Sequence, residues 1–230
     1  KTTVSYSYLM CLLIRHNQHV LFTGPTGTGK TIIAKTLIMN DLDKAIFTPI
    51  FINFSAQTSA NMTQDILDSK LDKRRKGVYG PPFGKRCVMF VDDLNMPARE
   101  KYFAQPPIEL LRQWMDHNGW YDRKTTEFIK IEDIQFASAM GPPGGGRNPV
   151  TQRYIRHYNL IGFTALPTDA LARIFTTILD WYLADFPSNI RPLGSPMVAA
   201  TIEIYEQIAQ VLLPTPPKSH YTFNLRDLSK

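Results

Sequence analysis

A single loop constrains the fold of this chain more than any other feature of its sequence. Its eight residues are Gly24, Pro25, Thr26, Gly27, Thr28, Gly29, Lys30 and Thr31. They match the phosphate-loop pattern GxxxxGK[ST] at every fixed position. A short apolar run from Val20 to Phe22 precedes the loop, and a segment with helical periodicity from Thr31 to Met39 follows it. A strand, a glycine-rich turn and a helix in this order predict an α/β domain that binds a nucleoside triphosphate.

The residue types in this loop explain how it would hold phosphates. Its glycines allow the backbone to curl so that successive N–H groups point at the β-phosphate. The helix that follows adds the positive end of its dipole at the same place. Lys30 would reach the β- and γ-phosphates, and the hydroxyl of Thr31 would ligate magnesium. We therefore predict that all eight loop residues bind the nucleotide.

Two acids complete the predicted magnesium site. Five apolar residues, Cys87 to Val91, are followed directly by Asp92 and Asp93. We predict that Asp92 holds magnesium through a bound water, and that Asp93 is the general base that polarises the attacking water. Acids often follow strands for other reasons, but their combination with a complete phosphate loop makes this interpretation specific.

Short apolar runs alternate with helical patterns along the first part of the chain. Strands are predicted at residues 19–23, 46–54, 87–91, 134–139 and 159–164. Helices are predicted at residues 31–39, 58–74 and 107–117. Asn118-Gly119 and the polar alternation after it predict a hairpin insertion before the fourth strand. This order predicts an α/β fold with an open parallel five-stranded sheet sandwiched by helices.

After residue 166 the pattern becomes helical. Apolar stripes at helical spacing cover residues 171–182 and 198–212, and Asn224 is a predicted cap of a third helix. We therefore predict a large α/β nucleotide-binding domain at residues 1–166 and a small α-helical lid domain at residues 167–230. The chain begins without methionine and stops within what reads as an unfinished helix. We expect a piece of a longer protein, with the lid truncated at its C-terminal end.

Composition restricts the classes of partner. There are 26 basic and 20 acidic residues, a formal charge of +6, with much of the excess between Lys70 and Lys76. No aromatic or base-reading residues interleave with this cluster, so we favour a solvated helix end with a charged loop over a nucleic-acid site. Cys11 and Cys87 lie in apolar stretches, which predicts buried thiols. The apolar runs are too short to span a bilayer, so no membrane partner is predicted.

Four further segments carry a family likeness. They are FINFSAQTSA (51–60), VDDLNMP (91–97), QPPIELLRQW (105–114) and SAMGPPGGGRN (138–148). Together with the phosphate loop they resemble the AAA+ ATPases, and among these the dynein heavy chains. The last three segments are most similar to the third AAA+ module of axonemal dyneins. The resemblance covers essentially the whole chain, and it implies a P-loop NTPase (AAA+) fold that binds ATP or ADP with Mg²⁺.

The resemblance also implies roles for three arginines. AAA+ modules form a ring, and Arg153 and Arg156 match the region that lends an arginine in trans to the preceding module's nucleotide. Arg226 resembles the lid arginine that senses this module's own γ-phosphate. The implied partners are the neighbouring AAA+ modules of the same heavy chain. Microtubules and dynein intermediate and light chains would be bound by parts outside this segment, in the cytoplasm and cytoskeleton, at the axoneme of a cilium or flagellum.

Two departures from the family pattern concern hydrolysis. Many active AAA+ sites carry glutamate where this chain has Asp93, and a misplacement of about 1 Å can lower a rate on the order of 100-fold. Residues 139–143 offer no polar side chain where the family often has a sensor for the attacking water. We therefore expect ATP binding with slow, regulatory hydrolysis that gates the main motor site. The alternatives are a fully active stand-alone AAA+ ATPase, a nucleic-acid-acting AAA+ protein, and a structural module with an empty pocket.

Overall fold

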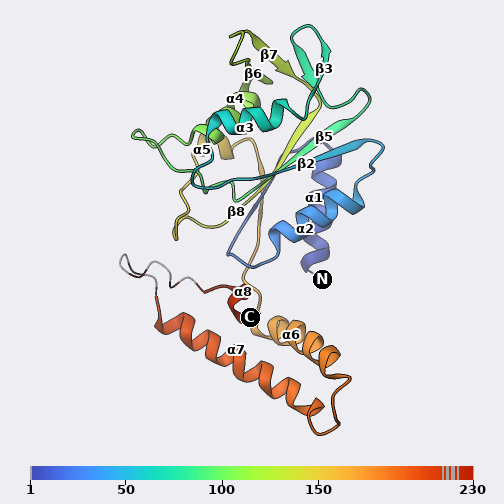
Figure 1. Ribbon diagram of the computed structural model, residues 1–230, viewed down its shortest axis with the longest axis vertical. Coiled ribbons are helices and arrows are strands. Elements are labelled where there is room, and N and C mark those ends of the chain that lie inside the picture. Colours follow the sequence, from blue (N-terminus) through green and yellow to red (C-terminus); the bar gives the residue numbers. More distant parts are fainter. Residues whose placement is uncertain (1, 214, 216–217, 219–220, 222, 230) are drawn as a thin grey trace. The chain divides into compact units, whose positions relative to one another are not determined.

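The computed structural model describes residues 2–213, 215, 218, 221 and 223–229 (Figure 1). They form two compact units. The first unit comprises Lys1–Gly24 and Gly29–Phe163, and the second comprises Pro25–Thr28 and Thr164–Lys230. Among the described residues, no helix combines the length and the apolar character that crossing a membrane requires.

A five-stranded parallel sheet forms the centre of the first unit (Figure 1). In spatial order its strands are β2 (Phe47–Asn53), β5 (Arg86–Asp92), β8 (Ile134–Met140), β1 (Val20–Thr23) and β9 (Asn159–Gly162). Every neighbouring pair is parallel, so the carboxyl ends of all five strands meet at one edge. The predicted fold class is confirmed, and the five strands fall where the apolar runs predicted them.

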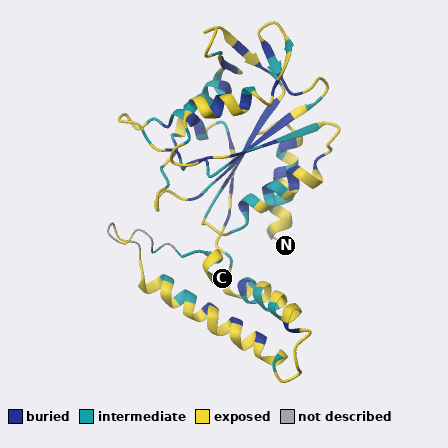
Figure 2. Cartoon of the chain, viewed as in Figure 1, coloured by how far each residue is buried: buried dark blue, intermediate teal, exposed yellow. Residues whose placement is uncertain are grey.

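Different helices cover the two faces of this sheet, because side chains alternate along each strand. In β5, Cys87, Met89 and Val91 belong to one apolar core, whereas Val88 and Phe90 belong to the other. The helices around the first core are α3 (Ala60–Asp68), α4 (Pro106–His117) and α5 (Gln152–Ile155). Those around the second are α1 (Thr2–Arg15), α2 (Lys30–Thr36) and the π-helical turn η1 (Leu37–Asp41). Figure 2 shows the central strands as a largely buried layer.

A second, smaller sheet belongs to the same unit, and the sequence predicted only half of it. Its strands, in spatial order, are β3 (Asp72–Arg75), β4 (Val78–Gly80), β7 (Phe128–Ile131) and β6 (Gly119–Tyr121). The antiparallel pair of β6 and β7 is the hairpin predicted after Asn118. The pairing of β3 with β4 was not predicted.

The helix predicted over residues 58–74 is wrong after Asp68, because α3 ends there and β3 begins at Asp72. Tertiary contacts override the local helical pattern here. Arg74 forms an ion pair with Asp133, and Arg75 lies 3.5 Å from a carboxylate oxygen of Glu132. The basic cluster therefore lies on a β-hairpin and not at a helix end, and acids match part of its charge.

The second unit is helical beyond residue 164. Its elements are α6 (Thr168–Leu183), the 3-10 turn η2 (Arg191–Leu193), α7 (Gly194–Val211) and α8 (Leu225–Leu228). Leu171, Val198 and Ile202 form a small core between α6 and α7, whose outer surfaces are largely exposed (Figure 2). The predicted cap at Asn224 is confirmed, because it forms a reciprocal capping box with Asp227 at the start of α8.

Candidate nucleotide-binding site

The predicted phosphate loop connects the end of β1 to the start of α2, at the carboxyl edge of the sheet. Gly24 opens the loop with a φ of 147°, and a Cβ there would stand 2.4 Å from the carbonyl oxygen of Phe163. Gly29 closes it as the N-cap of α2 with a φ of 84°, in the left-handed region. Both positions therefore require glycine. A helix start directs its N–H groups and the positive end of its dipole toward the preceding loop, so the loop fits an anion such as a phosphate.

Lys30, the first residue of α2, folds its side chain back over the loop. Its ammonium donates to the carbonyl oxygen of Gly24 at 2.9 Å. Burial lowers the pKa of Lys30; the charge of Arg147 lowers it further, and Asp92 and Asp93 oppose the shift. A cation held at this place can meet the phosphate oxygens of a nucleotide seated in the loop.

Thr31 and Asp92 lie together, although 61 residues separate them in the sequence. The hydroxyl of Thr31 donates to Oδ1 of Asp92 at 2.9 Å. Asp92 is the last residue of β5, so the parallel sheet brings its carboxylate to the loop. Magnesium in nucleotide sites takes one or two protein ligands and fills its other positions with water and phosphate oxygens. The pair fits that arrangement, and its role as a metal site stays a prediction.

Asp93 follows β5 with an uncommon backbone conformation. Its φ is 50°, a left-handed value that aspartate and asparagine tolerate better than most residues. Its side chain is 48% exposed, and its Oδ1 lies 3.4 Å from a terminal guanidinium nitrogen of Arg147. The predicted general base therefore contacts a cation that the sequence did not lead us to expect.

The end of β8 carries no polar side chain, as the sequence indicates. Ala139 is buried, and Gly141 has no side chain. Arg147 reaches this place instead, since a Cβ on Gly141 would stand 2.8 Å from its Nε. The three glycines at residues 144–146 are the signal that could have revealed it, because they allow the chain to turn back toward the strand end.

Comparisons with known proteins agree with this geometry. Residues 1–166 match the family described as P-loop containing dynein motor region. This chain belongs to that family. The resemblance to dynein heavy chains is thereby confirmed, whereas the third position in the ring stays a prediction.

Similar proteins include several axonemal dyneins. The chain is 54% identical over 230 residues to dynein axonemal heavy chain 12 of Rattus norvegicus, covering 99% of this chain and 7% of that protein. It is 52% identical over 229 residues to dynein axonemal heavy chain 3 of Mus musculus (99% and 6%). It is 54% identical over 241 residues to dynein axonemal heavy chain 1 of Mus musculus (99% and 6%). The chain therefore spans only a small part of each of these relatives.

The two arginines predicted to act in trans have different surroundings in this dynein motor region. Arg156, directly after α5, lies 2.8 Å from Oδ1 of Asp116, and His157 lies 3.0 Å from the same atom. The hydrogen bond from Arg156 is the main cause that lowers the pKa of Asp116. Arg153 instead lines a cavity of about 430 Å³, together with Arg99. Their three-residue spacing therefore does not give them a shared partner.

Arg226, the predicted sensor of the γ-phosphate, belongs to the second unit of the chain and lies beyond the residues that match the family. It lies in α8, where its backbone N–H donates to Oδ1 of Asn224 at 2.8 Å. Its side chain is exposed. The sensor role stays a prediction.

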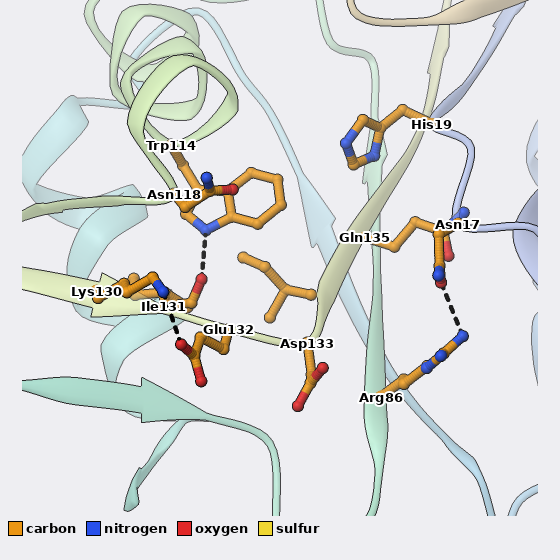
Figure 3. Close-up of a pocket in the computed structure, with 11 residues that line it drawn as sticks. Asn17, His19, Arg86, Trp114, Asn118, Lys130, Ile131, Glu132, Asp133 and Gln135 are labelled. Carbon is orange, nitrogen blue, oxygen red and sulfur yellow. Dashed lines mark hydrogen bonds and ion pairs between the residues drawn. The ribbon is translucent and has the colours of Figure 1, made fainter. Parts of the chain in front are cut away.

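Another cavity lies at the opposite edge of the sheet, where β1, β5 and β8 begin (Figure 3). Its volume is about 450 Å³, and its lining includes His19, Trp114 and Glu132. Burial lowers the pKa of His19 to about 4, so the imidazole is neutral near pH 7. The Lys130 ammonium lies 2.8 Å from Glu132. Because the strands are parallel, this cavity is separate from the phosphate loop at the carboxyl edge.

Proposed function

We propose that this dynein motor region is a regulatory ATP-binding module. It binds ATP or ADP with magnesium, hydrolyses ATP slowly, and gates the main motor site of its heavy chain. One contrast within the site supports this proposal. Lys30, Thr31 and Asp92 stand together at the loop, whereas Asp93 has a short side chain with Arg147 3.4 Å away. The carboxylate of Asp93 is one methylene shorter than that of glutamate, so it would stand farther from the attacking water and activate it more slowly.

The names of the relatives support a wider setting for the module. Each of the three described above is an axonemal dynein heavy chain. We propose that this chain likewise belongs to an axonemal heavy chain, in the cytoskeleton of a cilium or flagellum. Its direct partners would be the neighbouring AAA+ modules. Contacts with microtubules and with intermediate and light chains would lie in other parts of the protein.

Single-turnover hydrolysis tests whether the module is regulatory. Phosphate release is measured in the whole heavy chain. The release that remains in Lys30→Ala is subtracted, and the difference is the contribution of this site. We expect a rate at this site below about 1 s⁻¹, the lower end of typical enzyme rates. Release at about 10 s⁻¹, the rate of a median enzyme, would favour the fully active ATPase instead. ATP or ADP recovered from the denatured protein is also expected, and an empty site would favour a purely structural module.

Of the two candidate arginines, Arg153 is the better placed to act on the preceding module's nucleotide. Among the described residues no acid lies within ion-pair distance of Arg153, whereas Arg156 is paired with Asp116. We expect Arg153→Ala to slow hydrolysis at the preceding site by roughly 1000-fold. Arg156→Ala should mainly loosen its own surface contact, with a small effect on stability. A turnover loss in Arg156→Ala but not in Arg153→Ala would reverse the assignment.

A further inference from the structure

The loop that carries Arg147 is folded tightly and fixed to the segment that follows β5. Gly144 and Arg147 exchange two backbone hydrogen bonds, at 3.0 and 3.1 Å. The backbone N–H of Asn148 donates to the carbonyl oxygen of Asn95 at 2.9 Å. The side-chain amide of Asn95 in turn donates to the carbonyl oxygen of Gly141 at 2.8 Å. Arg147 therefore reaches the carboxyl edge of the sheet from a well-supported position.

The side chain of Arg147 crosses Gly141 at this edge. Glycine leaves the necessary space, because a Cβ on Gly141 would stand 2.8 Å from Nε and 2.9 Å from Cδ of Arg147. The side chain is 23% exposed and contacts Asp93 at 3.4 Å. Its Nε is buried and has no hydrogen-bond partner among the described residues. A buried donor without a partner is unfavourable, so the guanidinium still has hydrogen-bonding capacity for an anion.

Two cations share this edge of the sheet. After burial, the charge of Arg147 is the largest cause that lowers the pKa of Lys30, so the two groups are electrostatically close. Asp92 and Asp93 act on Lys30 in the opposite direction. The terminal phosphate of a nucleotide carries more negative charge than a carboxylate, and a guanidinium can bind it with two parallel hydrogen bonds. A γ-phosphate at the loop would therefore attract Arg147 more strongly than Asp93 does.

We propose that Arg147 recognises the γ-phosphate of ATP. When the triphosphate binds, the guanidinium gives up its contact with Asp93 and binds the γ-phosphate instead. With ADP, the guanidinium stays on Asp93 and occupies the carboxylate that would activate water. With ATP, it turns to the γ-phosphate and releases Asp93. This role rests on the proposed function, and it gives the regulatory site a means of distinguishing ATP from ADP.

A purely structural role for Arg147 predicts a different result. A single contact of 3.4 Å to a side chain that is 48% exposed contributes little to stability. If Arg147 were only structural, losing this contact would leave the affinities for ATP and ADP unchanged. If the loop moved as a result, both affinities would change by the same factor. The ratio of the ATP affinity to the ADP affinity therefore separates the two roles.

The test compares the binding of ADP and ATPγS to the intact heavy chain. Binding that remains in Lys30→Ala is subtracted, so that only binding at this site is compared. For Arg147→Ala we expect ATPγS to bind roughly tenfold more weakly and ADP to change by less than about twofold. Arg147→Lys keeps the charge but loses the planar fork, so its effect should be intermediate. The matched control is Arg123→Gln, which removes another arginine paired with an aspartate, Asp65. Neither affinity should change in that control.

Gly141→Ala gives a second variant that leaves the arginine in the chain. The added methyl group would displace Arg147, so the same loss of preference for ATPγS is expected. This variant and Arg147→Lys provide the test if Arg147→Ala does not fold. Equal changes in both affinities, or no change in either, would overturn the proposal. Identical binding by the wild type and Lys30→Ala would instead refute the nucleotide site itself, and this role with it.

Discussion

The Lys30→Ala variant is expected to bind ATP and ADP at this site at least about 100-fold more weakly than the wild-type protein. Lys30 is only 8% exposed, and its ammonium already donates to Gly24 at 2.9 Å. Much of its desolvation is therefore complete before a nucleotide binds, as the lowered pKa of Lys30 indicates. A hydrogen bond from a charged donor contributes about 1.5–3 kcal/mol. The loss of two such bonds to phosphate oxygens accounts for the expected factor.

Isothermal titration of the protein with ADP measures this effect. Lys35→Ala is the matched control, because Lys35 lies on the same helix, with its ammonium 6.0 Å from the ring centre of Phe51 and outside the loop. It should bind ADP normally. Lys30→Met removes the charge but keeps most of the side-chain volume, so it should match Lys30→Ala. Wild-type affinity in both Lys30 variants would show that the loop does not bind phosphates.

The central sheet could be predicted because its strands are buried on both faces. Such strands leave continuous apolar runs in the sequence, as between Cys87 and Val91. The order of the strands could not be read in the same way, because it depends on contacts between distant segments. The strand β3 was missed for a different reason, because its own residues carry no strand signal. Its sequence, Asp-Lys-Arg-Arg, has no apolar alternation, and its conformation depends on pairing with β4 and on the ion pair between Arg74 and Asp133.

In the candidate site, too, local sequence patterns identified some residues, whereas others depend on contacts made only in the folded chain. The loop and its flanks are a local pattern, so Lys30 and Thr31 could be identified from sequence. Asp92 could be added because the end of a buried strand is itself a local signal. Arg147 was missed, because the three glycines indicate a turn but do not say which side chain the turn brings to Asp93, and that depends on the space left at Gly141. The sequence also did not show that Arg153 and Arg156 have different surroundings, because that difference depends on Asp116 on α4, which pairs with Arg156.

Glutamate in place of Asp93 is the substitution expected to increase hydrolysis most. Glutamate is one methylene longer, so its carboxylate would reach farther than that of Asp93, whose Oδ1 lies 3.4 Å from Arg147. Because about 1 Å of misplacement can cost on the order of 100-fold, we expect the single-turnover rate to rise roughly 10- to 100-fold. Nucleotide affinities should change by less than about twofold, since Asp93 is not among the groups that hold phosphate. Asp93→Asn cannot accept a proton, and its rate should fall at least about 100-fold.

The backbone at residue 93 opposes this gain in rate. Its φ of 50° suits aspartate better than glutamate, so Asp93→Glu should lower the free energy of unfolding by about 1 kcal/mol. Asp133→Glu is the matched control, because Asp133 has a φ of 56° and lies just before β8, at the other edge of the sheet. It should show a similar loss of stability with no change in hydrolysis.

An unchanged rate in Asp93→Glu would mean that the length of the side chain does not limit the base. An unchanged rate in Asp93→Asn would mean that Asp93 is not the base, and that slow turnover needs another cause.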